Sequence, residues 1–395
     1  MAVDTAEKSE RSLGSLWTDQ RARAIFFQLL TVIGTVAFIF FIVNNTATNL
    51  EQRGIATGFG FLESAAGYDI GQKLVEYTPE NTHARAFLVG LLNTLLVAAV
   101  GIVLATILGF FLGVMRLSHN WLLSRVVYCY VEVVRNVPLL LQIYFWYAIF
   151  LVLPVVKESI ELGAGIFINN RGMQVPRPIA EPGFWAIPVA LLIGIVAAKA
   201  VGIWAKKRQD RTGQAFPTIS TGIGIIVGLP LLALVVTGFP VSFDVPELGR
   251  FRFTGGLTVF PEFVALLVAL TTYTAAFICE NVRSGIQAVS HGQTEASHAL
   301  GIKPSWTMRL IIIPQALRVI VPPLTSQYLN LTKNSSLGVA IGYQEVVATI
   351  SGTTLNQTGQ AIECIAITMA VYLTISLLIS AFMNWYNRRI ALVER

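Results

Sequence analysis

The stretch AFLVGLLNTLLVAAVGIVLATILGFFLGVM, residues 86–115, contains no Asp, Glu, Lys or Arg. A helix needs only about 20 predominantly apolar residues to cross the hydrocarbon core of a bilayer. Several charge-poor runs of this kind recur along the 395 residues, of which 54% are hydrophobic and 13% charged, and the mean hydropathy is +0.65. A soluble core does not tolerate several such runs. The chain is therefore predicted to be an all-α polytopic membrane protein.

Apolar runs between charged flanks predict about eight transmembrane helices. They cover residues 25–44, 87–114, 137–154, 184–202, 220–239, 263–287, 316–347 and 364–387. A polar segment precedes the first run and no small-residue cleavage pattern follows it, so we expect this run to stay as an anchor. Eight crossings place both termini on the same side of the membrane.

The distribution of basic residues predicts the orientation. With the N-terminus inside, 18 basic residues fall in cytoplasmic segments and 8 on the opposite side, while Lys199 and Lys333 lie inside spans. This bias follows the positive-inside rule and predicts that both termini are cytoplasmic. It also accounts for the net charge of +6 without a nucleic-acid partner.

The predicted external stretches, residues 45–83 and 155–183, are rich in Asn, Gly and Pro with mixed charge, as expected of exposed loops. They are too small to form a solute-binding domain, so another protein is expected to capture any specific solute. Two pairs of glycines four residues apart, Gly109 with Gly113 and Gly224 with Gly228, predict close approaches between membrane helices.

The stretch SHGQTEASHALGIKP, residues 290–304, predicts a short cytoplasmic helix. Ser290 with Gln293 forms a capping-box pattern, Gly301 suits the left-handed end of a helix, and Pro304 prevents its continuation. About ten residues are too few for a stable isolated helix, so this one needs a partner surface. The small residues Ala296, Ser297 and Ala299 and the charge of Glu295 favour docking on a protein, although a plain connecting loop stays open. A second helical piece is predicted from Trp306 to Ile313, with Pro314 opening the next span.

This loop resembles the EAA loop of ABC importer permeases. Glu295, Ala296, Ser297, Gly301, Ile311, Ile313 and Pro314 match its spacing, with Ser297 where Ala is usual and Ile313 where Leu is common. In that family the loop, here residues 290–314, forms the coupling helix, which sits in a groove of the ATP-binding subunit. The resemblance implies that Glu295, Ala296, Ser297, Ala299, Gly301 and Pro314 carry ATPase coupling.

Flanking motifs are similar to permeases for polar amino acids, and most of all to the larger permease subunit of bacterial general L-amino-acid importers. They are NTLLVA (93–98), YVEVVRNVPLLL (130–141), TAAFICE (274–280) and LTKNSSL (331–337). The second motif has Arg-Asn-Val-Pro where these permeases usually have Arg-Gly-Thr-Pro. The fourth has Lys-Asn-Ser-Ser where they usually have Lys-Asp-Thr-Ser.

The resemblance implies a type I (MetI-like) permease core of five helices, within residues 87–390 and interrupted by a two-helix insert at 155–255. An N-terminal segment with an extra helix (1–86) and a cytoplasmic tail (391–395) lie outside it. The implied partners are ABC ATPase subunits, a second related permease and a periplasmic amino-acid-binding protein, in the bacterial inner membrane.

Ionisable residues within membrane spans are candidates for the substrate path. Lys333, beside Asn334, is suited to an anionic group such as an amino-acid carboxylate, or else to a structural ion pair with Glu280 or Glu345. Gln142 and Arg135 enter the third predicted span, and Glu280 lies near the cytoplasmic end of the sixth. For Arg135 and Glu280, anchoring at the membrane interface is the alternative to a role in transport.

The sequence predicts no catalysis in this chain. It contains no Gly-x-x-x-x-Gly-Lys-Ser/Thr loop to bind nucleotide phosphates and no triad or metal-ligand spacing, and its three cysteines are scattered among apolar residues. No cofactor is expected here, since ATP and Mg²⁺ would be bound by the partner ATPase. A permease for another small polar solute, or a secondary transporter working alone, remains the alternative.

Overall fold

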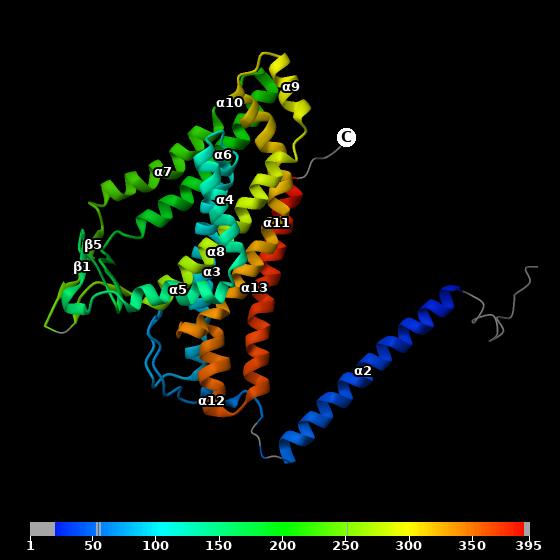
Figure 1. Cartoon of the computed structure of the whole chain (residues 1–395), viewed down its shortest axis with the longest axis vertical. Helices are drawn as coiled ribbons and strands as arrows, with labels where there is room; N and C mark the ends of the chain where they lie inside the picture. Colours follow the sequence, from blue (N-terminus) through cyan, green and yellow to red (C-terminus); the bar gives the residue numbers. More distant parts are fainter. Residues whose placement is uncertain (1–19, 53, 55–56, 251, 391–395) are drawn as a thin grey trace, which may run out of the picture.

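The computed structural model describes residues 20–52, 54, 57–250 and 252–390. The predicted tail 391–395 and the residues ahead of position 20 lie outside this range. The long helices are α2 (Gln20–Gln52), α3 (His83–Arg116), α8 (Pro261–Gln287), α11 (Ile313–Asn334) and α13 (Ala361–Ile390). Figure 1 shows α3, α8, α11 and α13 side by side in one bundle, with α2 apart from it.

Helix α8 is the centre of the bundle. It packs against α3, α11, α4 (Trp121–Asn136) and α5 (Leu139–Leu151). Its residues Leu266, Leu270 and Ile278 are fully buried in the largest apolar cluster of the molecule. By contrast, the apolar windows of α2 and α13 are almost entirely unburied, as expected of helices whose surroundings are lipid.

Helices α3 and α8 approach closely at the predicted glycines. A Cβ added at Gly109 would lie 2.5 Å from Cβ of Ile278, and one added at Gly113 would lie 2.6 Å from Cβ of Val282. Side chains larger than hydrogen do not fit at these two positions, which confirms the predicted close packing. At Gly224 and Gly228 nothing lies within 4 Å of an added Cβ, so the second predicted approach is wrong within the described structure.

The predicted span 137–154 contains one helix, α5, which is short and is joined to α4 by a sharp bend at its start. Helices α4 and α5 meet at Val137 and Pro138 with an angle of 107° between them, and α5 has only 13 residues. Proline cannot continue the hydrogen-bond ladder and disfavours the α conformation in the residue before it, which explains the break. Among the described residues, seven single helices are long and apolar enough to cross a membrane, and the bent pair makes eight when it is counted as one span.

The insert forms a separate helical hairpin on a small β base. Helices α6 (Ala186–Thr212) and α7 (Thr218–Val236) pack on each other and diverge from the bundle in Figure 1. The strands are β1 (Ile160–Gly163), β2 (Ile166–Asn169), β3 (Gly172–Val175), β4 (Arg177–Ala180), β5 (Val241–Asp244), β6 (Glu247–Leu248), β7 (Phe253–Thr254) and β8 (Leu257–Val259).

These strands form a four-stranded antiparallel sheet in the order β1-β2-β3-β8 and two two-stranded ladders, β4-β5 and β6-β7. A 3₁₀ turn, η2 (Val156–Glu158), precedes them. The stretch 155–183 is therefore not the plain exposed loop that its composition predicted. The bundle itself is helical, as expected.

The chain after α11 turns sharply instead of continuing the predicted span to residue 347. A 3₁₀ segment, η4 (Ser335–Ile341), ends at Gly342, whose φ of +83° reverses the chain. A π-helical segment, η5 (Val347–Thr354), and the short helix α12 (Leu355–Thr358) follow. This end of the bundle lies opposite α9 and α10 in Figure 1.

Candidate functional site

Helix α9 (His291–Ala299) is the short helix predicted between the sixth and seventh spans. Ser290 occupies the N-cap position, and Gly301 has a φ of +70°, so both predicted boundaries are confirmed. The side chain of Ser290 makes no capping hydrogen bond, however, and the predicted capping box is absent from the described structure. Figure 1 places α9 at one extreme end of the bundle, beside α10 (Pro304–Thr307).

One face of α9 is attached to the chain that follows it. The Ser297 hydroxyl, which is buried, is hydrogen-bonded to the Thr307 hydroxyl of α10. The Ile302 amide donates to the Ser297 carbonyl oxygen at 3.1 Å. The amide of Gln315 also reaches back to Gln293 at 3.3 Å. Ser297 therefore attaches α9 to α10, and the hydroxyl at this position of the motif has a structural role.

The opposite face of α9 is exposed. The Glu295 carboxylate lies 3.7 Å from the His291 ring, and both side chains are more than three-quarters exposed. Ala296 and Ala299 are exposed beside them, and the apolar Leu300 and Trp306 are 77% and 54% exposed. An exposed carboxylate among small and apolar side chains can take part in an ion pair and close packing at a protein interface.

The segment after α9 is one helix rather than two pieces. Helix α10 runs into a π turn, η3 (Met308–Ile312), and then into α11, in which Pro314 lies in the first turn. Proline lacks an N–H and is tolerated in the first turn of a helix, and the wider π turn lies just before it. Pro314 therefore opens α11, as predicted, but the predicted second piece and the span after it form one continuous helix that links α9 to the bundle.

Glu280 holds the ends of α3 and α8 together. Its carboxylate accepts hydrogen bonds from Arg116, the last residue of α3, and from Arg283 one turn further along α8, whose Nε lies 3.1 Å away. All three side chains are less than 30% exposed. The ion pair with Lys333 that was left open for Glu280 is not formed, and Glu280 pairs with two arginines instead.

Gln142 lies at the bend between α4 and α5 and stabilises it. Its side-chain amide donates to the carbonyl oxygens of Val134 and Val137 at 2.8 and 2.9 Å. These carbonyls lose their helical partners at the break, and an unpaired carbonyl is costly in lipid. Arg135 precedes the break, about 21 Å along α4 from Trp121, with its guanidinium 5.2 Å from the ring centre of Phe277. It lies within the bent pair, whereas the orientation count placed it in a cytoplasmic segment.

Lys333 and Asn334 end α11 near the opposite end of the bundle, about 29 Å beyond Pro314 at the helical rise. Lys333 is exposed and makes no ion pair among the described residues. The other partner left open for it, Glu345, is fully buried and is satisfied elsewhere. Its carboxylate accepts from the amides of Val347 and Ala348 and from the Tyr372 hydroxyl.

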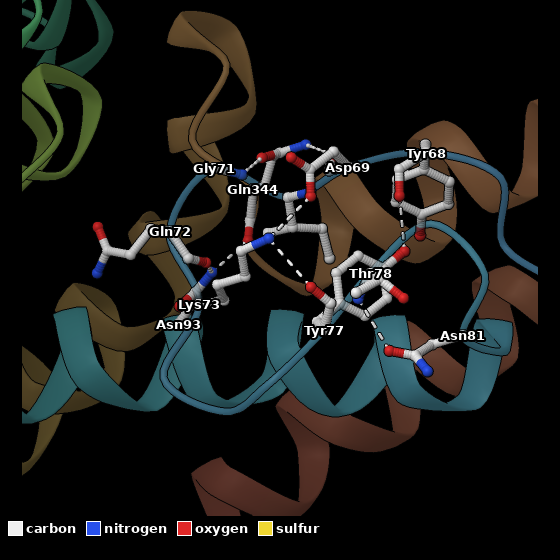
Figure 2. Close-up of polar contacts among 11 residues, drawn as sticks. Tyr68, Asp69, Gly71, Gln72, Lys73, Tyr77, Thr78, Asn81, Asn93 and Gln344 are labelled. Atoms are coloured by element: carbon white, nitrogen blue, oxygen red, sulfur yellow. Dashed lines mark hydrogen bonds and ion pairs between the residues drawn. The ribbon is translucent and has the colours of Figure 1, made fainter. Parts of the chain in front are cut away.

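The loop 57–82 is fastened to this far end by a network that sequence reasoning missed (Figure 2). The Gln344 side chain accepts from the Gly71 amide at 2.7 Å and donates to the Asp69 carbonyl at 2.9 Å. The buried amide of Asn93 donates to the carbonyls of Gln72 and Gln344, each at 2.9 Å. The predicted exposed loop is thus a bonded part of the core. The sequence did contain one indication of this network. Asn93 is a polar residue within the apolar run of α3, and a buried side-chain amide needs hydrogen-bond partners.

The family described as the binding-protein-dependent transport system inner membrane component matches residues 101–392. The chain belongs to this family. The match confirms the predicted type I (MetI-like) permease fold, and the permease is a component of a transport system.

Two relatives are similar to the permease over nearly its whole length. The general L-amino acid transport system permease protein of Rhizobium johnstonii is 54% identical, and the match covers 100% of this chain and 99% of that protein. The glutamate/glutamine/aspartate/asparagine transport system permease protein of Rhodobacter capsulatus is 44% identical, with 97% of each chain covered. A solved structure of an amino acid ABC transporter with histidines is 20% identical at a TM-score of 0.45, covering 78% of this chain and 95% of that chain.

Proposed function

We propose that this permease is the transmembrane subunit of an ABC importer that carries L-amino acids of a broad polar range across the bacterial inner membrane. The full-length similarity to relatives whose names specify general L-amino acids and acidic or amide amino acids carries this proposal. The specific amino acids are chosen by a periplasmic binding protein, since the described external segments form one four-stranded sheet, two two-stranded ladders and the hydrogen-bonded loop 57–82.

The exposed face of α9 is the docking surface for a separate ATPase. Glu295 forms the ion pair, Ala296 and Ala299 permit close contact, and Gly301 ends the helix. Two features support this role: α9 is attached by its Ser297 face alone, and the chain has no phosphate-binding loop of its own. ATP and Mg²⁺ are bound by the partner, and α9 transmits the closure of two ATPase subunits to the bundle.

The end of the molecule that carries α9 is cytoplasmic, as are both termini. Two observations support this orientation. The described residues give eight membrane crossings when the bent pair is counted as one span, and the basic residues of the sequence gather at that end. The permease core spans residues 87–390 with the insert 155–255. Ahead of this core, α2 supplies an additional helix and residues 57–82 form an external loop.

The substrate crosses between this permease and a second, related one by alternating access. Lys333 is the best candidate for contacting it, because it is exposed on this subunit and forms no ion pair within the part of the chain that the structure describes. Asn334 is its neighbour. Gln142, Arg135 and Glu280 remain candidates, although each has an internal contact that accounts for its position.

The docking proposal is tested on the complex purified with its ATPase and binding protein. Glu295→Ala should lower the amount of ATPase subunit that copurifies with the permease. It should also abolish uptake of labelled glutamate, glutamine and arginine by reconstituted vesicles. Glu161→Ala, which removes an exposed carboxylate from strand β1, is the matched control and should keep both. Full ATPase retention and uptake in the Glu295 variant would contradict the proposal.

The role of Lys333 is tested in the same vesicles. Lys333→Met should lose substrate-stimulated uptake while the basal rate of ATP hydrolysis is kept, because the residue lies far from α9. Unchanged uptake removes Lys333 from the substrate path. Uptake of sugars or other uncharged solutes in place of amino acids would overturn the substrate class.

A further inference from the structure

A basic pocket lies where α3 ends, α4 begins and α8 ends, at the same end of the bundle as α9. Its volume is about 480 Å³. It is lined by Arg116, Leu117, Ser118, His119, Trp121, Ser124, Arg125, Tyr128, Arg283 and Gln287. None of the roles proposed above uses this pocket.

The pocket carries an excess of positive charge. Three guanidinium groups meet there, and the Glu280 carboxylate is bonded to two of them, those of Arg116 and Arg283. Arg125 is exposed and makes no ion pair among the described residues. Its guanidinium carbon lies 5.3 Å from the ring centre of Tyr128, which orients it beside the pocket. The positive end of the α4 dipole, capped by Asn120 on the Leu123 amide at 3.2 Å, adds to the same field.

An apolar stripe leads away from the pocket along α4. Leu122, Val126 and Val133 are 63%, 59% and 63% exposed, with exposed Cys129 between them at helical spacing. The stripe extends about 16 Å at the helical rise. The indole of Trp121, 75% exposed, lies at its start, where aromatic side chains mark the membrane interface.

The stripe ends at a second, apolar cavity of about 460 Å³ in the bend between α4 and α5. Val133 belongs to both features, and aromatic and aliphatic side chains form most of the lining. The cavity is lined by Tyr130, Val133, Val134, Val137, Leu141, Gln142, Phe145, Trp146 and Thr272. A basic pocket is thus joined to an apolar cavity by an exposed apolar surface of roughly one leaflet's depth.

We propose that these three features form a binding site for one anionic phospholipid of the inner leaflet. The phosphate lies in the basic pocket against Arg125, and an acyl chain follows the stripe to the cavity at the bend. A free phosphate ion would use the pocket alone and leave the stripe and cavity exposed. A zwitterionic headgroup would bring a cation toward three arginines, so the site selects a net negative charge.

Native mass spectrometry of the full chain in detergent tests the site by titration with phosphatidylglycerol, phosphatidylcholine of the same acyl chains, and inorganic phosphate. Phosphatidylglycerol should bind more tightly than phosphatidylcholine. Arg125→Gln should weaken phosphatidylglycerol binding about fivefold, equal to about 1 kcal/mol for one basic residue at an anionic surface. Arg125→Lys, which keeps the charge, should retain most of the affinity.

Two further variants separate this site from general attraction of anionic lipid. Lys206→Gln removes one positive charge from the cytoplasmic end of α6 and should leave the affinity unchanged. Val133→Asn should weaken binding of the lipid, because it interrupts the stripe. Equal phosphatidylglycerol affinities of Arg125→Gln and the unmodified chain would overturn the proposal. So would displacement of the lipid by millimolar inorganic phosphate, which would make the pocket a free-anion site.

Discussion

The close approach of α3 and α8 makes a quantitative prediction for a single methyl group. Gly109→Ala places a Cβ 2.5 Å from Cβ of Ile278 and 3.0 Å from the carbonyl oxygen of Ala275. Ordinary carbon contacts are about 3.5–4.0 Å, so the helices must separate by about 1 Å. Ile278 is β-branched and its Cβ is fixed to the backbone, so no rotamer change relieves the overlap.

Overpacking of a well-packed core typically costs about 1–3 kcal/mol. Replacing glycine inside a helix by alanine returns about 0.5–1 kcal/mol. At the midpoints of these two ranges, the expected net effect of Gly109→Ala is a loss of about 1 kcal/mol in the free energy of unfolding. Gly224→Ala is the matched control, because nothing lies within 4 Å of the added Cβ on α7. It should be neutral or stabilising by up to about 1 kcal/mol.

Both variants are compared with the unmodified chain by SDS titration in mixed micelles, followed by circular dichroism. The two substitutions are chemically identical, so the difference between them isolates the helix contact from helix propensity. A Gly109→Ala chain as stable as the unmodified one would refute the reasoning. So would a Gly224→Ala chain destabilised to the same extent.

Three other perturbations follow from the contacts. Glu280→Gln should lower the free energy of unfolding by about 1–3 kcal/mol in the same titration, because two mostly buried arginines lose their charged partner. Glu161→Gln should have no effect, because this carboxylate is exposed. Gln344→Ala should speed amide exchange of Gly71 about tenfold through loss of two hydrogen bonds, whereas exposed Gln357→Ala should not.

The third concerns pH. Burial raises the pKa of Tyr77, in the loop 57–82, to about 12 from an ordinary value of 10. As the pH rises, the Tyr77 phenol ionises in the unfolded chain before it ionises in the folded one. The contribution of the neutral phenol to the free energy of unfolding is therefore complete below about pH 10 and is lost as the pH rises through about 12. Tyrosinate absorbance of the chain minus that of Tyr77→Phe should show this late titration. A difference that titrates near pH 10 would contradict it.

Much of the fold was predictable because lipid imposes strong constraints on sequence. Long charge-free runs have few alternatives to a membrane helix, so α3, α6, α7 and α8 were found with approximate bounds. The short helix α9 was found by a different kind of signal, the conformational need for glycine at position 301. Both signals are local, and each depends on residue types with few other uses.

The features that were missed depend on side-chain hydrogen bonds and ion pairs, which runs of apolar residues do not reveal. The bend at Pro138 is stable because Gln142 satisfies two carbonyls, and no apolar run reveals that geometry. The loop 57–82 looks like any polar loop until Gln344, some 270 residues later, is placed against it. Glu280 looked like a candidate for the substrate path because its arginine partners come from two different helices.

The pairing of β3 with β8 has a consequence for folding. Met173 lies opposite Val259, so the chain leaves the core and returns to it at adjacent points. The contact between Gly109 and Ile278 joins positions 169 residues apart in sequence. Once the ladder forms, the loop that must close is shorter by the 86 residues between Met173 and Val259. Loop-closure entropy depends logarithmically on length, so this shortening is worth only about 0.6 kcal/mol. A segment as long as the one between Met173 and Val259 can therefore be inserted between two packed helices at little cost in free energy, provided that its two ends are held together.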